Sequence, residues 1–139
     1  MPPKLLYRLP TVDEYNALRR SVEWPEFGDD LVKRALDNTL FSIVAVDDDG
    51  EAIGMGRVIG DNAIYFHIQD VIVRSDYNGT GVGTLMMREL LDYVDKHCGK
   101  NTNIGLMCSK GREPFYRNFG FAERPTEKFG SGMIKVVQS

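Results

Sequence analysis

The spacing of hydrophobic residues divides the first part of the chain into short helices and strands. Residues 5–9 alternate apolar and polar positions, as a strand does, and Pro10 ends that alternation. Residues 11–14, Thr-Val-Asp-Glu, have the form of a capping box, in which a hydroxyl is followed three positions later by a carboxylate. We therefore expect a helix from there to about residue 22, and a second short helix over residues 29–36.

The central part of the chain favours strands. Residues 41–46 are rich in β-branched and aromatic side chains, and residues 51–59 return as the second arm of a hairpin. The acidic turn between them lacks the later ligands of a calcium loop, so we expect a solvated turn and no metal. Residues 63–73 form a long, mostly apolar run, which is typical of a strand buried on both faces.

The last third of the chain alternates helices and strands. Helical spacing predicts a long helix over residues 81–98 and a short one over residues 113–118. One strand is expected at residues 103–108, and two final strands are expected at residues 121–122 and 133–137. The whole order predicts a mixed α/β fold, with an antiparallel meander followed by a right-handed βαβ crossover.

Length and composition restrict the class of protein. A chain of 139 residues with 27% charged residues is expected to form a single globular domain over residues 1–139. A net charge of -3 gives no general reason to bind nucleic acid, and no apolar stretch approaches a membrane span. Cys98 and Cys108 do not have zinc-site spacing, so we expect two reduced thiols in a cytoplasmic protein.

A glycine-rich segment carries the most specific chemical signal. Gly79, Gly81 and Gly83 follow a buried strand and open a helix, an arrangement that gathers backbone N–H groups into a site for phosphate. The dinucleotide fingerprint fails because Thr84 stands where its last glycine belongs, and the P-loop fails because no lysine follows. A glycine turn without a ligand is the alternative, but each of these glycines carries an entropic cost.

Residues 78–83, Asn-Gly-Thr-Gly-Val-Gly, resemble the [QR]-x-x-G-x-[GA] acetyl-coenzyme A motif of the GNAT superfamily, the GCN5-related N-acetyltransferases, with Asn78 as the one departure. Residues 115–121 resemble a second signature of that family, F-Y-x-x-x-G-F. The resemblance covers most of the chain. It implies a central mixed sheet of about six to seven strands with about four helices, and a V-shaped opening between the fourth and fifth strands.

The resemblance also implies where acetyl-CoA binds. The fourth strand is expected to carry a bulge, and the backbone groups of Val71, Ile72 and Val73 would hold the pantetheine arm. The N–H of Val71 would polarise the thioester carbonyl as an oxyanion donor. The pyrophosphate would lie on the glycine-rich loop and the first helical turn, at Asn78, Gly79, Thr80, Gly81, Val82, Gly83 and Thr84.

The implied reaction is direct attack of a primary amine on the thioester. Tyr116 occupies the tyrosine position of the second signature and would protonate the leaving thiolate. His67 is the candidate base because it shares one strand parity with Gln69 and is the group there that titrates near neutrality. A hydrogen-bonded strand histidine is the alternative, and Glu23 is the other candidate base. Asp70 is expected on the opposite face as a buried, hydrogen-bonded carboxylate.

The loop after the first helix is expected to overhang the acceptor. Glu23 and Trp24 would suit a cationic amine, with Gln69 as a further contact, although Trp24 also reads as a core anchor. The acceptor would be a small-molecule or peptide amine, and homodimers are common in this family. A non-catalytic acyl-CoA-binding or regulatory module with the same fold is the alternative function, because the fourth strand lacks an obvious glutamate base. A generic nucleotide-binding protein is a third reading.

Overall fold

Five strands form one mixed sheet in the order β1-β2-β3-β4-β5. The structure is a computed structural model that describes residues 2–138. The first four strands pair antiparallel and β5 pairs parallel to β4, as the meander and crossover predict. The strands are β1 (Lys4–Leu6), β2 (Phe41–Val46), β3 (Ala52–Gly60), β4 (Tyr65–Val73) and β5 (Asn103–Gly105).

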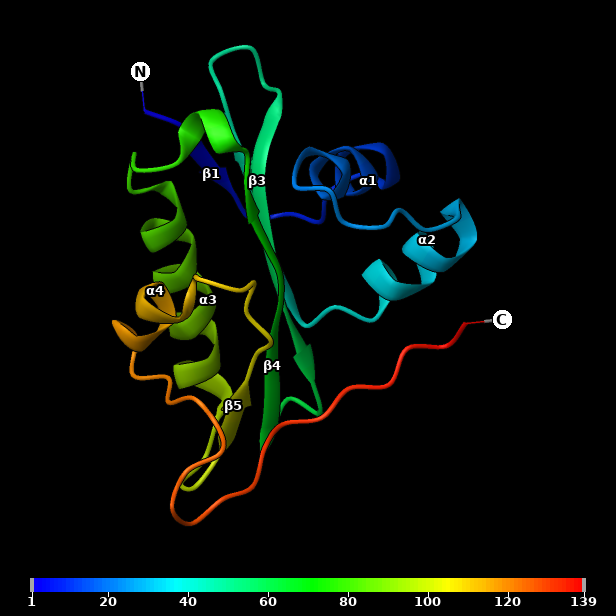
Figure 1. Cartoon of the computed structure of the whole chain (residues 1–139). Helices are drawn as coiled ribbons and strands as arrows, with labels where there is room; N and C mark the ends of the chain where they lie inside the picture. The colour runs from blue at the N-terminus through cyan, green and yellow to red at the C-terminus, as the bar shows by residue number, and fades with distance from the viewer. Residues whose placement is uncertain (1, 139) are drawn as a thin grey trace. The chain divides into compact units, whose positions relative to one another are not determined.

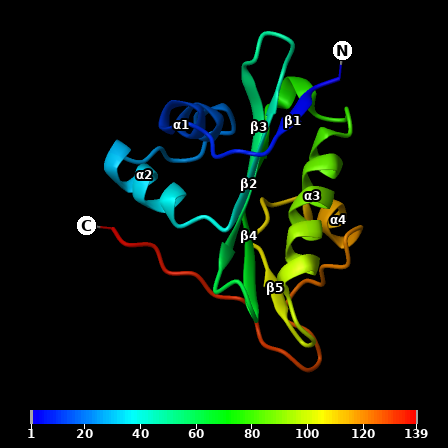
Figure 2. The ribbon, with the colours of Figure 1, turned by 180° about the vertical axis from the view of Figure 1, so that it is seen from behind.

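The chain separates into two compact units, one up to Leu106 and the other from Met107 onward. The first unit holds the whole sheet. Its helices are α1 (Val12–Ser21), α2 (Asp29–Asp37) and α3 (Val82–His97), and a 3-10 turn, η1 (Ser75–Tyr77), precedes α3. Helices α1 and α2 cover one face of the sheet and α3 covers the other (Figures 1 and 2).

The N-terminus of α1 confirms the predicted capping box. The Glu14 backbone N–H donates to the Thr11 hydroxyl at 3.1 Å, and the Thr11 N–H donates to the Glu14 carboxylate at 2.8 Å. Each bond satisfies a donor that the helix itself leaves unpaired. The same carboxylate also accepts from the Arg8 guanidinium, which ties the end of the preceding loop to the helix.

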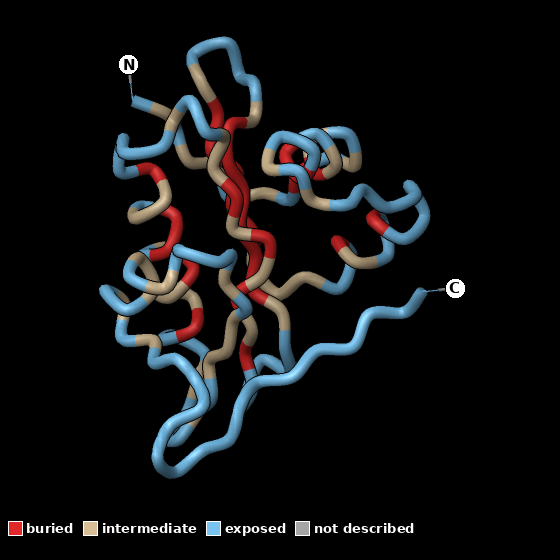
Figure 3. The backbone as a smooth tube through the Cα atoms, viewed as in Figure 1, coloured by how far each residue is buried: buried red, intermediate tan, exposed pale blue. Residues whose placement is uncertain are grey.

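The buried backbone runs along the middle strands of the sheet (Figure 3). On the α3 face, Met86 and Leu90 are fully buried against β3. They can approach because β3 has glycines there: a Cβ added at Gly56 would lie 2.9 Å from Leu90 Cδ1, and one at Gly54 would lie 3.1 Å from Met86 Sδ. The two glycines thus set the close packing of the helix on the sheet.

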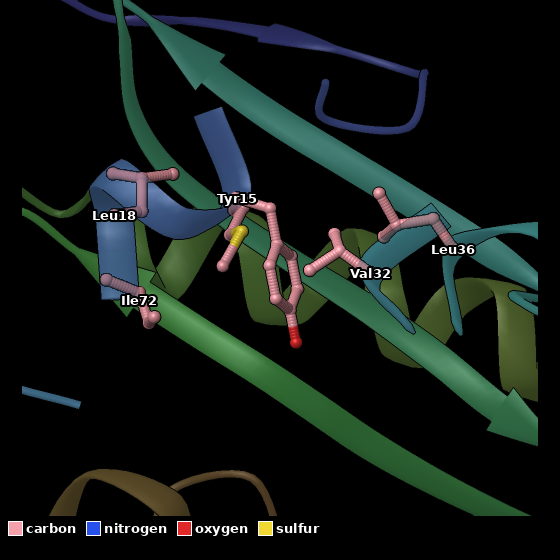
Figure 4. Close-up of a cluster of buried hydrophobic side chains, with 6 residues drawn as sticks. Tyr15, Leu18, Val32, Leu36 and Ile72 are labelled. Carbon is pink, nitrogen blue, oxygen red and sulfur yellow. The ribbon is translucent and has the colours of Figure 1, made fainter. Parts of the chain in front are cut away.

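A second cluster of apolar side chains lies on the opposite face. Figure 4 shows Tyr15 and Leu18 of α1, Val32 and Leu36 of α2, and Ile72 of β4 turned toward one another. All five are at most 5% exposed. This cluster holds α1 and α2 on the sheet next to the second half of β4, where the candidate site begins.

The second unit contains the helix α4 (Glu113–Arg117) and no strand among its described residues. The prediction of strands at residues 121–122 and 133–137 is therefore wrong, and the sheet has five strands rather than six to seven. The apolar side chains of the final segment, including Met133 and Ile134, are exposed. Their β-propensity is not realised because no ladder of backbone hydrogen bonds forms along them.

Candidate functional site

The two parallel strands at the edge of the sheet separate after a short contact. Strand β5 pairs with β4 only at Tyr65, Phe66 and His67, whose partners end at Gly105. Strand β4 continues to Val73, so residues 68–73 have no strand partner on that edge. The strand expected over residues 103–108 is half as long as predicted, and this early end produces the expected opening between strands 4 and 5.

Strand β4 carries the expected bulge. Met55 pairs with Ile72 and Arg57 pairs with Gln69, so two residues of β4, Asp70 and Val71, lie opposite one residue of β3. Asp70 has a φ of 57°, which is uncommon for a residue with a side chain. A bulge of this kind interrupts the ladder and redirects the side chains that follow it.

The bulge changes which side chains share a face. Gln69 and Asp70 are consecutive, yet both line the cavity beside α1 and α2, and the Gln69 Nε2 donates to Asp70 Oδ1 at 3.3 Å. Val71 instead lies on the α3 face, since its side chain is 3.5 Å from the Cβ position of Gly56. The expectation that Asp70 lies on the face opposite Gln69 is therefore wrong, because it assumed an uninterrupted period of two.

His67 lies where β4 and β5 part. The ring is half-buried, and burial lowers its pKa below the ordinary value of 6.5, while a hydrogen bond with Gln69 and the charge of Asp70 act in the opposite direction. The lowered pKa favours a neutral imidazole at neutral pH, the form that accepts a proton.

Asp70 is the centre of a buried polar cluster on the α1–α2 face. The residue is 4% exposed, as expected of a buried carboxylate. Its oxygens accept hydrogen bonds from the Tyr15 hydroxyl at 2.8 Å, Arg19 Nη1 at 3.0 Å and Arg57 Nε at 2.9 Å. The sequence predicted a hydrogen-bonded carboxylate but none of these partners, because they come from α1 and β3. Burial and the nearby carboxylate raise the pKa of the Tyr15 hydroxyl.

The Arg19 guanidinium lies among aromatic rings. Its Cζ is 5.7 Å from the Tyr15 ring centroid, 5.3 Å from that of Trp24 and 4.8 Å from that of Phe27. Trp24 also packs against the core cluster, which agrees with its alternative reading as an anchor. The cation that faces the Trp24 ring is therefore the Arg19 side chain of the protein itself. Glu23 is exposed on the turn after α1.

A cavity of about 390 Å³ opens between α1, α2 and the bulge of β4. This volume is at the lower end of the range for small-molecule sites, roughly 300–1,000 Å³. Of the expected acceptor contacts, the cavity includes Gln69, whereas Glu23 and Trp24 are outside its lining. The lining residues are Tyr15, Arg19, Phe27, Leu31, Val32, Ala35, Arg57, Gln69 and Asp70.

The glycine-rich loop presents a row of unpaired backbone donors. Gly79 and Gly81 have φ angles of 78° and 88°, and Gly81 is the N-cap of α3. Within the described chain, the N–H groups of Gly79 and of residues 81–84 donate no hydrogen bond, and the first helical bond runs from Leu85 to Gly81. A Cβ at either glycine would enter open space. The loop therefore fits a pyrophosphate, because its donors are unpaired and the space beside Gly79 and Gly81 is open.

Tyr116 lies on α4 in the second unit. Its ring packs edge-on against Phe115, with centroids 5.0 Å apart, and against Phe121, with centroids 6.3 Å apart. Burial raises the pKa of the phenol most, and the nearby Cys108 raises it further, so Tyr116 is protonated at neutral pH. The pKa of the Cys108 thiol is also raised, chiefly by burial, which disfavours the reactive thiolate.

The profile of the acetyltransferase (GNAT) family matches residues 6–121. The chain belongs to the GNAT acetyltransferase family. A solved structure from meticillin-resistant Staphylococcus aureus, a protein of unknown function described as a probable acetyltransferase, is 31% identical and has a TM-score of 0.88. That similarity covers 97% of this chain and 99% of the other.

Other relatives support the family and the fold. An uncharacterized N-acetyltransferase, ycf52-like, from Prochlorococcus marinus is 31% identical over 117 residues, which are 81% of this chain and 63% of the relative. This GNAT chain thus spans less than two thirds of the curated relatives it matches. The Escherichia coli protein YhbS, solved in complex with CoA, has a TM-score of 0.68 at 23% identity, over 88% of this chain and 69% of that one, and shows the shared fold.

The described residues of this GNAT chain lack both a membrane-spanning helix and a cluster of metal ligands. No helix there has the length and apolar character that crossing a bilayer requires. No three or more His, Cys, Asp or Glu side chains between residues 2 and 138 gather as metal ligands would.

Proposed function

We propose that this chain is an N-acetyltransferase that moves the acetyl group of acetyl-CoA to a primary amine by direct attack in a ternary complex. The observation that carries the proposal is the course of one segment, from the bulge of β4 into the glycine loop and α3. Along it, a strand edge without a partner leads directly to five unpaired N–H groups at a helix start. This layout suits a long ligand with a thioester at one end and a pyrophosphate further along.

The chain's own residues have separate tasks in this proposal. Acetyl-CoA supplies the activated acetyl group. The backbone of Val71, Ile72 and Val73 would hold the pantetheine arm, and the Val71 N–H would stabilise the negative charge that develops on the carbonyl oxygen. The N–H groups at Gly79 and residues 81–84 would bind the pyrophosphate. Holding both substrates in line is the largest contribution that such a scaffold offers.

Two side chains would move protons. His67, with its lowered pKa, would accept a proton from the amine directly or through water. Tyr116, with its raised pKa, would deliver one to the leaving thiolate.

The cysteines at positions 98 and 108 are both free thiols, which fits a reducing compartment such as the cytoplasm.

Two measurements on the whole chain test the proposal. Acetyl-CoA at 100 times its dissociation constant should stabilise the fold by about 2.7 kcal/mol, and a panel of primary amines should release free CoA thiol. An unchanged melting curve with acetyl-CoA, alongside a shift with ATP or NAD, would favour a generic nucleotide site. Stabilisation without thiol release for any amine would favour a non-catalytic acyl-CoA-binding module.

A further inference from the structure

The cavity beside the bulge carries more positive than negative charge. Its charged lining consists of Arg19, Arg57 and Asp70, so the formal sum is +1. Both arginines are only 9% exposed and share a single carboxylate. The aromatic rings around Arg19 and the carbonyl oxygens of Pro25 and Ala35 stabilise the guanidinium groups but have no net charge. A buried excess charge is unfavourable unless an anion joins it.

Each arginine also retains donors. Arg19 uses Nε and Nη1 in hydrogen bonds, and Arg57 uses the same two nitrogens. Within the described chain, the Nη2 groups of both arginines make no hydrogen bond, and neither is among the fully buried atoms without a partner. Both Nη2 groups therefore retain some solvent-exposed surface, and the planar guanidinium is well suited to binding an oxyanion.

The rest of the lining defines the body of the ligand. Phe27, Leu31, Val32 and Ala35 form an apolar wall, and Gln69 and Asp70 connect the cavity to the bulge of β4. The bulge leads directly to Val71, where the thioester is expected. A small molecule in the cavity would thus have its amine near that strand and its other groups near α1 and α2.

We propose that the acceptor is a small amine that also carries a carboxylate and an apolar body, with the carboxylate bound by the free guanidinium donors of Arg19 and Arg57. A single negative charge matches the excess charge of the cavity, which favours a carboxylate over a doubly charged phosphate. This inference rests on the proposed function only in treating the bound ligand as the acetyl acceptor. The oxyanion site itself depends on the cavity alone.

The first experiment compares matched acceptors with the wild-type chain. Phenylalanine, phenylalaninamide and phenethylamine share an amine and an aromatic body, and only the first has a carboxylate. We expect kcat/KM for phenylalanine to exceed that for the other two by about tenfold or more, the value of a charge-assisted hydrogen bond. Equal or better turnover of the amide or of phenethylamine would overturn the inference while leaving the acetyltransferase activity in place.

The second experiment needs no turnover. Calorimetry would compare 3-phenylpropionate, 3-phenylpropionamide and phenyl phosphate binding to the wild-type chain. Binding of the carboxylate about tenfold or more tighter than the amide supports the site even if no amine is acetylated, which would then count against the proposed function alone. Equal binding, or no binding, of carboxylate and amide refutes the site, and binding of the phosphate alone refutes its assignment to a carboxylate.

A variant locates the effect. Gln69→Glu adds one negative charge beside the two arginines and brings the formal sum of the cavity to zero. The preference for carboxylate over amide should then fall below about twofold, since the excess charge is gone. Gln138→Glu makes the same chemical change at an exposed position and should retain the preference. An equal effect of the two variants would place carboxylate binding outside this cavity and refute the inference.

Discussion

Replacement of Asp70 by asparagine tests whether the buried cluster holds this fold together. The amide has nearly the same shape as the carboxylate, so packing should be retained. What disappears is the negative charge between Arg19 and Arg57, whose nitrogens lie 3.0 and 2.9 Å from its oxygens. The local formal charge rises from +1 to +2 among side chains of residues that are at most 9% exposed.

The expected cost of Asp70→Asn is similar whether the lost hydrogen bonds or the broken buried ion pair are considered. Each of the two charge-assisted hydrogen bonds contributes about 1.5–3 kcal/mol. Removing one partner of a buried ion pair costs about 3–5 kcal/mol. The free energy of unfolding of a domain is only about 5–15 kcal/mol. We therefore expect a loss of about 3–5 kcal/mol, and a fall in Tm on the order of 10–20 °C for a chain of this length.

Urea unfolding followed by fluorescence measures this loss, because Trp24 is the single tryptophan and its ring lies 5.3 Å from the Arg19 guanidinium carbon. Tyr15→Phe is the matched control, since it removes one neutral donor to the same carboxylate and should cost about 1–2 kcal/mol. Arg57→Met combined with Asp70→Asn should lose less than the sum of the single changes, because the double variant leaves one fewer buried cation. A loss of unfolding free energy below about 1 kcal/mol for Asp70→Asn would refute the reasoning. So would a loss that salt abolishes, because salt screens buried ion pairs only weakly.

Substitutions at Gly81, Tyr116 and His67 test three other parts of the site. Gly81→Asp should abolish stabilisation by acetyl-CoA because it places a negative charge at the unpaired donors, whereas Gly50→Asp, at a similar φ of 80° with open space, should retain it. Tyr116→Phe should lower kcat on the order of 10²-fold with little change in acetyl-CoA affinity; an unchanged kcat would remove the phenol from the mechanism. The folded chain binds the His67 proton less tightly than the unfolded chain, so the free energy of unfolding should fall as the pH drops through 6.5. His67→Gln should reduce that fall in urea titrations across this pH range, and an identical pH dependence would show that His67 is hydrated.

Local signals in the sequence were sufficient where structure is determined locally. The capping box at Thr11 and the β-branched run at residues 41–46 formed the predicted elements with the predicted starts. The final segment at residues 133–137 has similar composition but no ladder of hydrogen bonds, so its propensity did not produce a strand. Propensity alone predicts a strand only where a neighbouring strand completes it.

The candidate site was less predictable because it depends on contacts between distant residues. The bulge leaves the alternation of buried positions along β4 undisturbed, so the pattern of Ile68, Asp70 and Ile72 reads as a regular strand. The available signal was the aspartate itself, a charged residue in a buried position that requires partners. Those partners, Arg19 and Arg57, are separated from Asp70 by 51 and 13 positions in the sequence. In the sequence pattern they look like ordinary polar positions of a helix and a strand.

The same bulge serves both substrates in the proposed reaction, which links stability to function in this chain. One extra residue in β4 turns Asp70 toward the cavity and leaves Val71 on the other face, next to the partnerless strand edge. The left-handed backbone of Asp70, with its φ of 57°, is unfavourable by itself, and residues in such conformations persist where their surroundings hold them. Here Tyr15, Arg19 and Arg57 hold the carboxylate from two other elements. Substitutions that weaken this cluster should therefore displace the proposed acceptor cavity and the backbone proposed to bind the thioester together, rather than one alone.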